Sequence, residues 1–540
     1  MSQERNQGAL EKFTSELDYV IFGVGVVVAA LAVGAFVFRE EAASELMWDI
    51  NTVLWEDLGW AYLLIMFVLV IFVIFLILSP WGNIKLGDED TEPEFTFLSY
   101  FVMLYSAAIA AGIVFWGPTE GVVFFGDPFE QGIGMFGTGM GEEQSAVAAI
   151  QYTFFHWGIS AWSAYVVMAI PIAYLAYRYD APLRISTVIA PWVGFDNLDS
   201  FWAKLIDIIA VFATIGGVAT TLGLVGSQFL VGLEYNYGIE LGDMGTVIAI
   251  TFLTVAFTIS VAAGIKKGIR RVSYFNMALF VAMLIAVFLL GPTRYIMMTG
   301  TEALGNYINQ FITMSFYTES SSAEATGFVG GWTVFYWAWW FSWAPFVGLF
   351  IARISKGRTV RQVAFTGVFA ATGVTIPWFA TMGGTAIYME MNDIAPILVT
   401  YEEFGFNEAV VGYPMFEALT FGALFMTLFL VLITTFFITS ADSSTLALGM
   451  LTTGGAESPS TINRVIWGGL IGLLASILMV VGGVDALQAA AIITGGPFGI
   501  ILLVAVAAMI SLFGRRHPIF LQEEEEGLPS AVDQFAQDDD

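Results

Sequence analysis

The residues of this chain best suited to binding chemistry are aromatic. Residues 332–343 read WTVFYWAWWFSW, and no charged residue follows until Arg353. With a helical repeat of 100° per residue, the rings of Tyr336 and Trp343 fall within about 60° of Trp340, as does the indole of Trp337. Indole and phenol faces attract cations without a formal countercharge. We therefore expect one face of this helix to bind a cationic group.

A second aromatic group follows at residues 156–165, HWGISAWSAY. Trp162 and Tyr165 share a helix face, and Trp157 lies further round the same arc. Together with Trp340 they could form a cage for a quaternary ammonium group, which has no hydrogen to donate and is best recognised by ring faces, at about 0.5–2 kcal/mol per contact. The alternative is that these rings belong to interfacial belts or to ordinary packing.

A zwitterionic ligand needs a second contact for its anionic end. Backbone N–H groups around Ala108, Ala110 and Gly112 could supply it if the helix opens there, and the hydroxyl of Thr221 is another candidate. No Lys or Arg lies within these stretches, so a carboxylate would meet dipoles rather than charge. No acid lies in the small-residue stretch either, which favours a betaine over choline.

Residues 434–444, TTFFITSADSS, carry several oxygen ligands. Thr439 and Ser440 offer the hydroxyl and carbonyl oxygens that a hard cation such as sodium prefers. Thr214 adds a hydroxyl from another stretch. The alternative is that these side chains bond to their own helix backbone. We expect Asp442 to be a structural or gating partner for a loop arginine.

Few other residues could do chemistry. The chain has no cysteine and two histidines, which excludes thiolate metal sites and argues strongly against a histidine-rich centre. We expect His156 to be a hydrogen-bonded structural residue rather than a proton carrier. We expect Glu120 to face an outer vestibule or to cap a helix.

The elements that position these residues are membrane helices. The chain is 57% hydrophobic and 12% charged, with a mean hydropathy of +0.77, which excludes a soluble globular protein. A spanning helix needs about 20 apolar residues. Twelve stretches qualify: 19–38, 58–79, 97–123, 145–177, 203–233, 244–264, 273–292, 331–352, 363–388, 413–443, 463–482 and 486–513. The predicted fold is thus an all-α integral membrane protein with 12 transmembrane helices.

The loops indicate the orientation. With the N-terminus in the cytoplasm, all but two of the 19 Lys and Arg residues lie inside, as the positive-inside rule requires. Both termini are then cytoplasmic. Residues 298–316 are amphipathic and are expected to lie along the outer surface. The predicted organisation is 1–18 tail, 19–96 two peripheral helices, 97–292 first repeat, 293–330 outer loop, 331–513 second repeat and 514–540 acidic tail.

Two of the predicted spans carry helix-breaking signals. The third contains a run of small residues and then Gly117 and Pro118, and the eighth contains Pro345. These spans are five apart, so spans 3–7 and 8–12 would be corresponding halves of opposite orientation. Interrupted helices at matching positions of inverted repeats indicate a binding site at the membrane midplane. The alternative is close helix packing by small residues.

The net charge of −28 must sit on loops and tails. A strongly acidic aqueous surface resists nucleic acid and anionic lipid. It also suits a chain that stays hydrated in concentrated salt, and we expect a halophilic source. Full stability in dilute buffer would contradict that expectation.

The chain resembles the betaine/choline/carnitine transporter (BCCT) family over nearly its whole length. The resemblance rests on WTVFYWAWWFSWAPFVGLFIARISKGRTVRQV at 332–363, HWGISAWSAY at 156–165, FWGPTEG at 115–121 and TFFITSADSS at 435–444. It implies a LeuT-type 5+5 inverted-repeat core in spans 3–12 preceded by two extra spans, usually in a homotrimer, which moves compatible solutes by alternating access. It implies no enzymatic activity and a location in the cell membrane.

The resemblance also implies roles for particular residues. The aromatic box would be Trp157, Trp162, Tyr165 and Trp340. Trp343 would hold substrate on the cytoplasmic side, with Trp339 and Phe350 as candidate gates. In sodium-coupled members of the family, one sodium site would map to Ser106, Ile109, Phe436, Thr439 and Ser440. A second would use Thr214 and Phe346.

The sequence departs from the family pattern at several places. The family's GxGxG reads Ala108-x-Ala110-x-Gly112 here, which is expected to stiffen the helix and narrow the substrate range. Val218 stands where a second threonine is expected, which weakens the second sodium site. The C-terminal tail is acidic rather than basic, which argues against regulation by anionic lipid. No arginine stands in the core of the fifth span, which favours sodium symport.

Three functions are open to a chain with these features. The first is sodium-coupled import of glycine betaine or a similar trimethylammonium zwitterion. The second, within the family, is a sodium-independent exchanger or a choline or carnitine carrier. The third is an ion channel or a membrane enzyme. Repeated filter-like segments are missing for a channel, and paired His, Cys or carboxylate groups at membrane depth are missing for an enzyme.

Overall fold

The computed structural model describes residues 9–108, 110–126, 132–137, 139–262, 268–320 and 327–517. All long elements among these residues are helices. Among these residues, ten helices are long and apolar enough to cross a membrane, or eleven if one bent pair counts as a span. The long helices and the segments that continue them are α2 (Tyr19–Phe38), α4 (Gly59–Leu78), α5 (Phe97–Ala107), α6 (Ala110–Gly126), α7 (Glu142–Trp157), α8 (Ile159–Tyr179), α10 (Phe201–Tyr237), α11 (Gly242–Ala262), α12 (Gly268–Leu290), α14 (Phe335–Ile354), α15 (Val360–Ala364), α16 (Ala371–Met391), α19 (Gly422–Leu451) and α20 (Thr461–Arg516).

Shorter or less apolar helices connect them. They are α1 (Ala9–Glu16), α3 (Glu40–Thr52), α9 (Ala190–Val193), α13 (Thr293–Phe316), α17 (Ile397–Glu403) and α18 (Gly412–Ala418). A π-helical turn, Val329–Val334, leads directly into α14. The amphipathic segment expected to lie on the outer surface is α13, which packs against α7 and α16 and is not among the apolar spans of the described chain.

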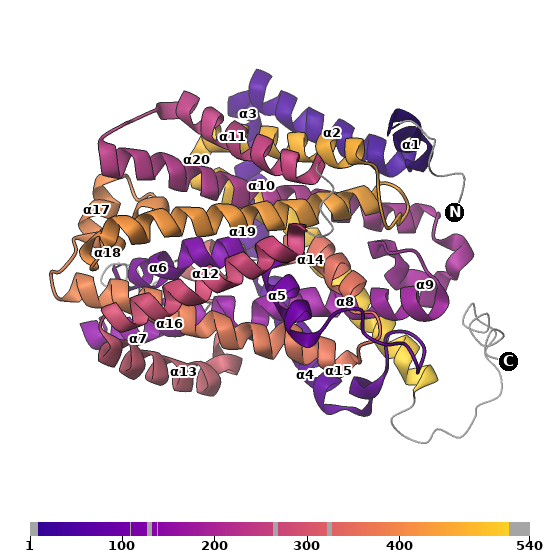
Figure 1. Ribbon diagram of the computed structural model, residues 1–540, viewed down its shortest axis with the longest axis horizontal. Helices are drawn as coiled ribbons and strands as arrows, with labels where there is room; N and C mark the ends of the chain where they lie inside the picture. The colour runs from indigo at the N-terminus through magenta and orange to yellow at the C-terminus, as the bar shows by residue number, and fades with distance from the viewer. Residues whose placement is uncertain are drawn as a thin grey trace.

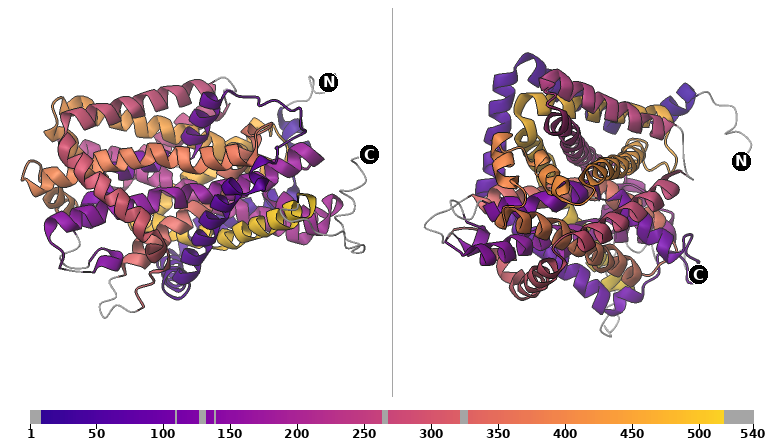
Figure 2. Two further views of the ribbon diagram at one scale, coloured as in Figure 1. Left: turned by 90° about the horizontal axis from the view of Figure 1, so that it is seen from below. Right: turned by 60° about the vertical axis from the view of Figure 1, so that its left-hand side comes forward.

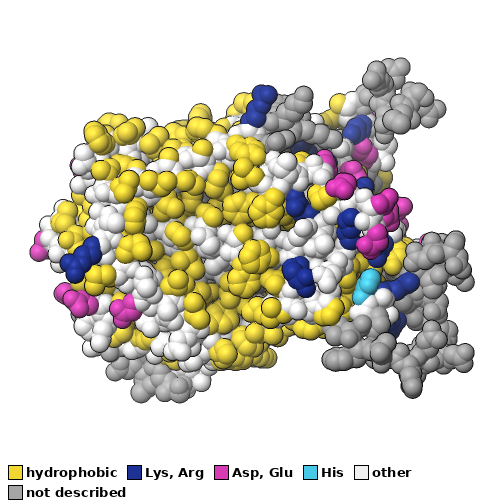
Figure 3. All heavy atoms as spheres, turned by 60° about the horizontal axis from the view of Figure 1, so that its bottom comes forward, with side chains coloured by type: hydrophobic (Ala, Val, Ile, Leu, Met, Phe, Trp, Pro, Cys, Tyr) yellow, Lys and Arg dark blue, Asp and Glu magenta, His cyan; other side chains and the backbone are white. Residues whose placement is uncertain are grey.

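The long helices run roughly parallel as a bundle (Figures 1 and 2). In Figure 1, α17 and α18 lie at the left-hand end, while α1 and the last turns of α20 lie at the right-hand end. Charged side chains gather mainly at the right-hand end in Figure 3, with a smaller group at the left, and a broad apolar belt separates them. That belt is the surface a bilayer covers, so the chain is a multi-pass membrane protein.

The third predicted span is broken in the middle of the bundle. Its two halves, α5 and α6, meet at an angle of 64°. Ala108 follows α5 with φ −85° and ψ −144°, outside the helical region. Ile109 and the side chain of Ala110 lie outside the described residues. The opening predicted among the small residues is therefore confirmed, whereas Pro118 lies inside α6.

The eighth predicted span is not broken. The prediction of an interruption at Pro345 is wrong, because α14 runs through this proline from Phe335 to Ile354. The helix packs against α8, α10, α19 and α20, and every residue of its most apolar stretch is buried. Neighbours on all sides hold the helix together where the proline removes one backbone hydrogen bond.

Two other boundaries differ from the prediction. The tenth span begins at Gly422, not at 413, because α18 ends at Ala418 and Phe421 then adopts a left-handed conformation with φ +71°. The last two predicted spans form one element, α20, which carries non-helical dihedral angles at Gly482 and Gly483. Gly483 has φ +60°, which glycine adopts without strain.

Candidate functional site

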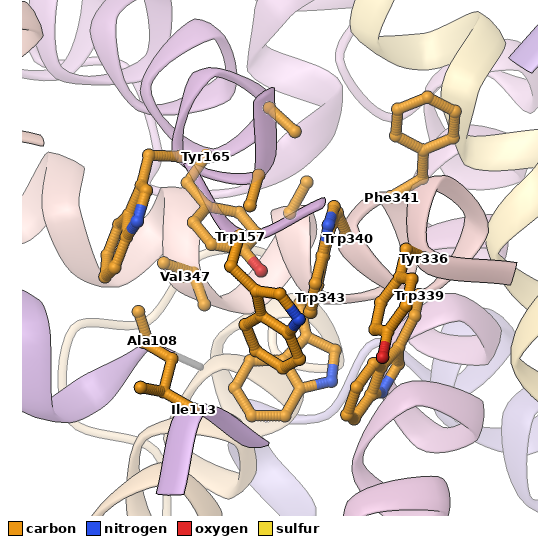
Figure 4. Packing of buried hydrophobic residues seen from close by; sticks show 14 of the residues in the cluster. Ala108, Ile113, Trp157, Tyr165, Tyr336, Trp339, Trp340, Phe341, Trp343 and Val347 are labelled. Atoms are coloured by element: carbon orange, nitrogen blue, oxygen red, sulfur yellow. The ribbon is translucent and has the colours of Figure 1, made fainter. Parts of the chain in front are cut away.

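Four rings meet at the centre of the bundle, and we call them the ring cluster: Trp157 at the end of α7 and Tyr336, Trp339 and Trp340 on α14. All four are fully buried. Trp339 and Trp340 stack with their centroids 5.0 Å apart, and Trp157 meets Trp340 edge-on at 4.8 Å. Figure 4 shows these rings gathered together, with Ala108 and Ile113 of the broken span in the same view. The structure therefore brings Trp157 and Trp340 together, as the sequence predicts.

Backbone carbonyls fix the orientation of these indoles. Trp340 donates its ring N–H to the carbonyl of His156 at 3.0 Å. Trp339 and Trp343 both donate to the carbonyl of Gly217 on α10, at 3.3 and 3.1 Å. Gly217 can approach this closely only without a side chain, since a Cβ there would lie 2.2 Å from the hydroxyl of Ser342. Gly217 was not predicted as a site residue, and the only signal for it in the sequence is the glycine pair Gly216–Gly217 within α10.

The broken span touches the ring cluster through Gly112. A Cβ at Gly112 would lie 3.1 Å from the ring of Trp157 and 3.2 Å from that of Trp339. These distances are tighter than ordinary van der Waals contacts, so a glycine lets α6 approach both indoles. The small-residue stretch is thus positioned beside the rings, which is the placement predicted for it.

Trp162 and Tyr165 on α8 form a separate pair. Their rings meet edge-on at 6.2 Å, and Trp162 also stacks on Tyr105 of α5 at 5.3 Å. The indole N–H of Trp162 and the hydroxyl of Tyr165 are buried without a hydrogen-bond partner among the described residues. Buried donors of this kind are normally satisfied, so two unpaired donors in one pair of rings leave room for a ligand acceptor.

Glu120 belongs to the site, which contradicts the expectation that it faces an outer vestibule or caps a helix. Its carboxylate is fully buried and accepts hydrogen bonds from the indole N–H of Trp157 and from the hydroxyl of Tyr336 at 2.7 Å. Its other oxygen lies 2.9 Å from Nδ1 of His156. His156 is hydrogen-bonded as predicted, with Nε2 3.0 Å from the hydroxyl of Thr333.

Oxygen atoms gather where α5 ends beside α19. The hydroxyl of Thr439 donates to the carbonyl of Ser106 at 3.0 Å and to that of Phe436 at 2.7 Å. Ser440 donates to the carbonyl of Ala108 at 3.0 Å. Carbonyl and hydroxyl oxygens are the donor set that suits a hard monovalent or divalent cation. The oxygen-bearing members of the first predicted sodium site, Ser106, Thr439 and Ser440, therefore lie together, with a donor set that suits such an ion. The bond from Thr439 to Phe436 is also the own-helix bonding left open as the alternative.

The second predicted ion site is less well supported. Thr214 of that site is buried on α10, but its hydroxyl donates to a carbonyl of its own helix at 2.8 Å. Thr221, the candidate for the anionic end of the substrate, does the same at 3.1 Å. Phe346 is buried on α14 and contacts the ring of Trp343, with centroids 5.0 Å apart. The backbone bonding left open as an alternative is therefore what the structure shows for these two threonines.

The partner expected for Asp442 is Arg464, at the start of α20. The two form an ion pair that is mostly buried, and the same guanidinium donates to the carbonyl of Asp442 at 3.2 Å. Asp442 lies two residues beyond Ser440, so this pair joins α20 to the segment of α19 that carries the oxygen atoms. The structural partnership predicted for Asp442 is confirmed, with a helical rather than a loop arginine.

A line of rings leads from the ring cluster to a large cavity. Trp339 contacts Trp343 at 6.2 Å, and Trp343 contacts Phe346 at 5.0 Å. One turn further along α14, Phe350 lines a cavity of about 920 Å³, together with Glu94, Phe95, Met103, Tyr177, Leu183, Arg271, Tyr274, Arg353, Ile354, Lys356, Leu446 and Glu457. Its charged residues lie at the end of the bundle that carries α1, since Lys12 of α1 bonds to the carbonyl of Ser458.

The opposite end of the ring cluster is filled. Phe124 of α6 contacts Trp332 at 4.9 Å and Phe328 at 5.0 Å. Tyr152 of α7 contacts the same Phe328 at 4.9 Å. The site is therefore separated by packed rings from the end that holds α17 and α18, and the cavity lies toward the other end, which holds both described termini.

The family model and the similar proteins point to the same family of transporters. Residues 20–517 match the family described as BCCT, betaine/carnitine/choline family transporter. The glycine betaine transporter OpuD of Bacillus subtilis is 36% identical over 91% of this chain and 93% of its own length. An ectoine/hydroxyectoine transporter of Virgibacillus pantothenticus is 36% identical, over 90% of this chain and 94% of its own.

Among solved structures, the chain is similar to one with a TM-score of 0.38. It is the substrate-bound outward-open state of a Na⁺-coupled sialic acid symporter, 14% identical, and the match covers 86% of this chain and 87% of the symporter.

Proposed function

Because the chain belongs to the betaine/carnitine/choline transporter family, we propose that it is a sodium-coupled importer of glycine betaine or a closely related trimethylammonium zwitterion. Its relatives are named as transporters, so the protein is not an enzyme. A secondary transporter of betaine-like solutes is the function that this family carries. The substrate, the coupling ion and the residues that bind them are what the proposal adds.

The observation that carries the proposal is the ring cluster. Trp157, Tyr336, Trp339 and Trp340 are fully buried at the centre of a membrane protein, in contact with one another and with the break between α5 and α6. A trimethylammonium group offers no hydrogen-bond donor, and stacked and edge-on rings supply the faces it prefers. Interfacial belts do not explain rings that lie away from the bilayer surface.

The carboxylate end of the zwitterion would take the two unpaired donors on α8. The indole N–H of Trp162 and the hydroxyl of Tyr165 have no partner in the described structure. A carboxylate would satisfy both donors with charge-assisted hydrogen bonds, which are about twice as strong as neutral ones. This assigns the anionic end to α8 rather than to Thr221, whose hydroxyl already bonds to Gly217.

Sodium would be held between α5 and α19. The carbonyls of Ser106 and Ala108 and the hydroxyls of Thr439 and Ser440 fit its ligand preference. When bound, the ion would couple its own gradient to that of the substrate. The chain holds these oxygens at the break of the third span. Whether sodium is bound and where α6 lies would therefore depend on each other.

The finer architecture is also part of the proposal. The 56 residues of α20, at about 1.5 Å rise per residue, extend far beyond a bilayer core of about 30 Å, so we assign two spans that meet at Gly482–Gly483. With the bent pair counted as one, this gives twelve spans, arranged as two peripheral helices and two inverted repeats of five. The distribution of basic residues supports cytoplasmic termini. The homotrimer rests on the family resemblance alone.

The cavity indicates how the substrate would leave. It opens at the end that holds α1, and its lining residue Phe350 lies one turn beyond Phe346, the last ring of the line that starts at Trp339. Packed rings close the other end. Trp343 and Phe346 are themselves buried and still separate the ring cluster from this cavity. Phe350 would be the residue at which the path to the α1 end opens during an alternating-access cycle.

The test is uptake of labelled glycine betaine by proteoliposomes. Accumulation should require an inward sodium gradient, and Trp340→Leu should raise the KM by about two- to thirtyfold, since one ring contact is lost. Trp202→Leu is the matched control, because Trp202 is 66% exposed on the outside of α10. Unchanged transport by Trp340→Leu would overturn the role of the ring cluster.

The same assay separates the alternatives. Uptake that ignores sodium but depends on internal substrate would identify an exchanger. Unlabelled choline, carnitine and ectoine, added as competitors, would identify another substrate. Ectoine is included because a relative with 36% identity is named as an ectoine/hydroxyectoine transporter.

A further inference from the structure

Glu120 is an acidic residue in the centre of the bundle with an uncommon set of partners. Its side chain is fully buried, and its oxygens lie against Trp157, Tyr336 and His156. Two of these partners are members of the ring cluster. An isolated carboxylate is costly at this depth, so one that is retained there and held by the rings of the site calls for a functional explanation.

We propose that Glu120 is the countercharge of the ring cluster, which favours the positive end of the substrate and orients the zwitterion. The proposal rests on the proposed function, because it assigns a residue that sets the charge preference of the same site. Glu120 touches the edges of the rings and not the substrate, so it acts as a positioning residue through Trp157 and Tyr336.

The hydrogen bonds favour the ionised carboxylate. The indole N–H of Trp157 and the hydroxyl of Tyr336 both donate to the same oxygen, Oε2. An indole nitrogen can only donate, and a carboxylate oxygen that receives two donors is best satisfied when it carries charge. The third contact, from His156 to Oε1, adds a donor when Nδ1 is protonated, and the hydroxyl of Thr333 then donates to Nε2.

The negative charge strengthens the attraction of the rings for a cation in two ways. A donor that bonds to a carboxylate is polarised, so electron density moves from the N–H or O–H toward the ring face. The charge itself also acts across the ring, in a region of low effective dielectric constant where charges are poorly screened. Trp157 and Tyr336 both contact Trp340, at 4.8 and 5.6 Å, so both effects converge on the predicted ammonium position.

The same charge repels the anionic end of a zwitterion. Glycine betaine would therefore bind with its ammonium group toward Trp157 and its carboxylate away from Glu120, toward the unpaired donors of Trp162 and Tyr165 in the described structure. For a zwitterion the attraction and the repulsion partly cancel, whereas a simple cation is only attracted. Loss of the charge should thus weaken choline binding more than betaine binding.

The experiment compares calorimetric binding of choline and of glycine betaine to the purified full-length protein. In Glu120→Gln, which keeps the size of the side chain and one acceptor oxygen, we expect the Kd for choline to rise by about tenfold and that for betaine by clearly less. Tyr336→Phe breaks one hydrogen bond and keeps the charge, so both Kd values should change by the same factor. Glu408→Gln, measured at about pH 8 where that buried carboxyl is ionised, removes a charge outside the ring cluster and should leave the ratio unchanged.

Each outcome decides the proposal. An unchanged choline-to-betaine ratio in Glu120→Gln would overturn it, as would an equal shift in Glu408→Gln, since the effect would then not come from the ring contacts. Failure of the proposed function gives a different result: absent betaine uptake in proteoliposomes, or an unchanged KM in Trp340→Leu.

Discussion

Gly217 shows how much of the site depends on a residue without a side chain. Its carbonyl receives the ring N–H groups of Trp339 and Trp343, which lie one turn apart on α14. One acceptor thus sets the rotamers of two indoles, one in the ring cluster and one in the line that leads to the cavity. The position of α10 and the orientation of the rings are therefore linked.

Gly217→Ala should disturb both indoles. The new Cβ would lie 2.2 Å from the hydroxyl of Ser342 and 2.7 Å from the ring of Trp343, so α10 and α14 must separate. We expect a loss of about 1–3 kcal/mol in stability, as for other overpacked sites, together with a weaker Kd for glycine betaine. Thermal unfolding and calorimetry measure the two effects.

Gly373→Ala is the control for that experiment. Gly373 lies within α16, and a methyl group added there would have no described atom within 4 Å beyond its own stretch of helix. The substitution should leave the Kd unchanged. Equal changes in stability and in Kd in the two variants would show that neither depends on the close approach of α10 to α14.

Residues that line the site with their own rings could be predicted from the sequence. Residues whose role depends on a contact with another helix could not. The spacing of Trp157 and Trp340 places each on an inward face, and both are in the ring cluster. Glu120 follows Gly117 and Pro118 in a pattern typical of a helix end, and nothing in its neighbourhood indicates that two other helices direct donors at it. Only the packing of α6, α7 and α14 reveals that role.

At the scale of elements, the break between α5 and α6 is secured by α19. Two successive residues of α19, Thr439 and Ser440, donate to carbonyls at and just beyond the end of α5. A helix that stops in the membrane leaves carbonyls without their usual partners, and these hydroxyls satisfy them. The same oxygens form the proposed sodium site, so stabilising the break and binding the ion use one set of atoms.

Ser440→Ala should therefore weaken sodium binding more than substrate binding. We expect the sodium concentration for half-maximal uptake to rise severalfold, with little change in the betaine KM at saturating sodium, because one ligand oxygen is lost. Ser444→Ala is the matched control: Ser444 is buried on the same helix, and its hydroxyl donates within α19, to the carbonyl of Ala441. A similar change in both variants would assign the effect to α19 in general and not to the ion site.

The helices themselves were largely predictable, because long apolar stretches leave few alternatives in a membrane. The error at Pro345 has a physical reason: proline disfavours a helix locally, but tertiary packing overrides that preference when neighbouring helices surround it. Prolines lie inside α6, α8, α14, α16 and α20 in the same way. The start of α19 was misplaced because residues 413–416 are apolar and yet belong to a separate helix, α18, that ends before Phe421.

At the scale of the whole molecule, the connection between α16 and α19 folds back onto the bundle. Its helices α17 and α18 contact α6, and Glu408, between them, is 8% exposed. The hydroxyl of Thr119 on α6 reaches the backbone carbonyl of Glu408 at 3.5 Å. This loop thus covers the end of the bundle opposite the cavity, and it carries a carboxyl group into a buried position.

The stability of this covering should depend on pH. Burial raises the pKa of the Glu408 carboxyl from 4.5 to about 7. The folded state then holds the proton more tightly than the unfolded state, so the contribution is full below pH 4.5 and is lost as the pH rises to about 7. Glu408→Gln should remove this loss, which is on the order of 3 kcal/mol, and raise the Tm at about pH 8 but not at about pH 4.5.

Thermal unfolding of the purified protein across this pH range checks the prediction. Glu403→Gln, at an exposed position of the same loop, serves as the control. A Tm difference that is the same at both pH values would show that the buried carboxyl of Glu408 does not titrate in this range.

The stacked pair Trp339 and Trp340 has an optical consequence. With centroids 5.0 Å apart and planes inclined by only 19°, the electronic transitions of the two indoles couple to each other. Such coupling produces a paired signal in circular dichroism whose size depends steeply on separation and angle. A molecule that enters between or against these rings must alter that signal, so the unlabelled protein carries its own spectroscopic probe of occupancy.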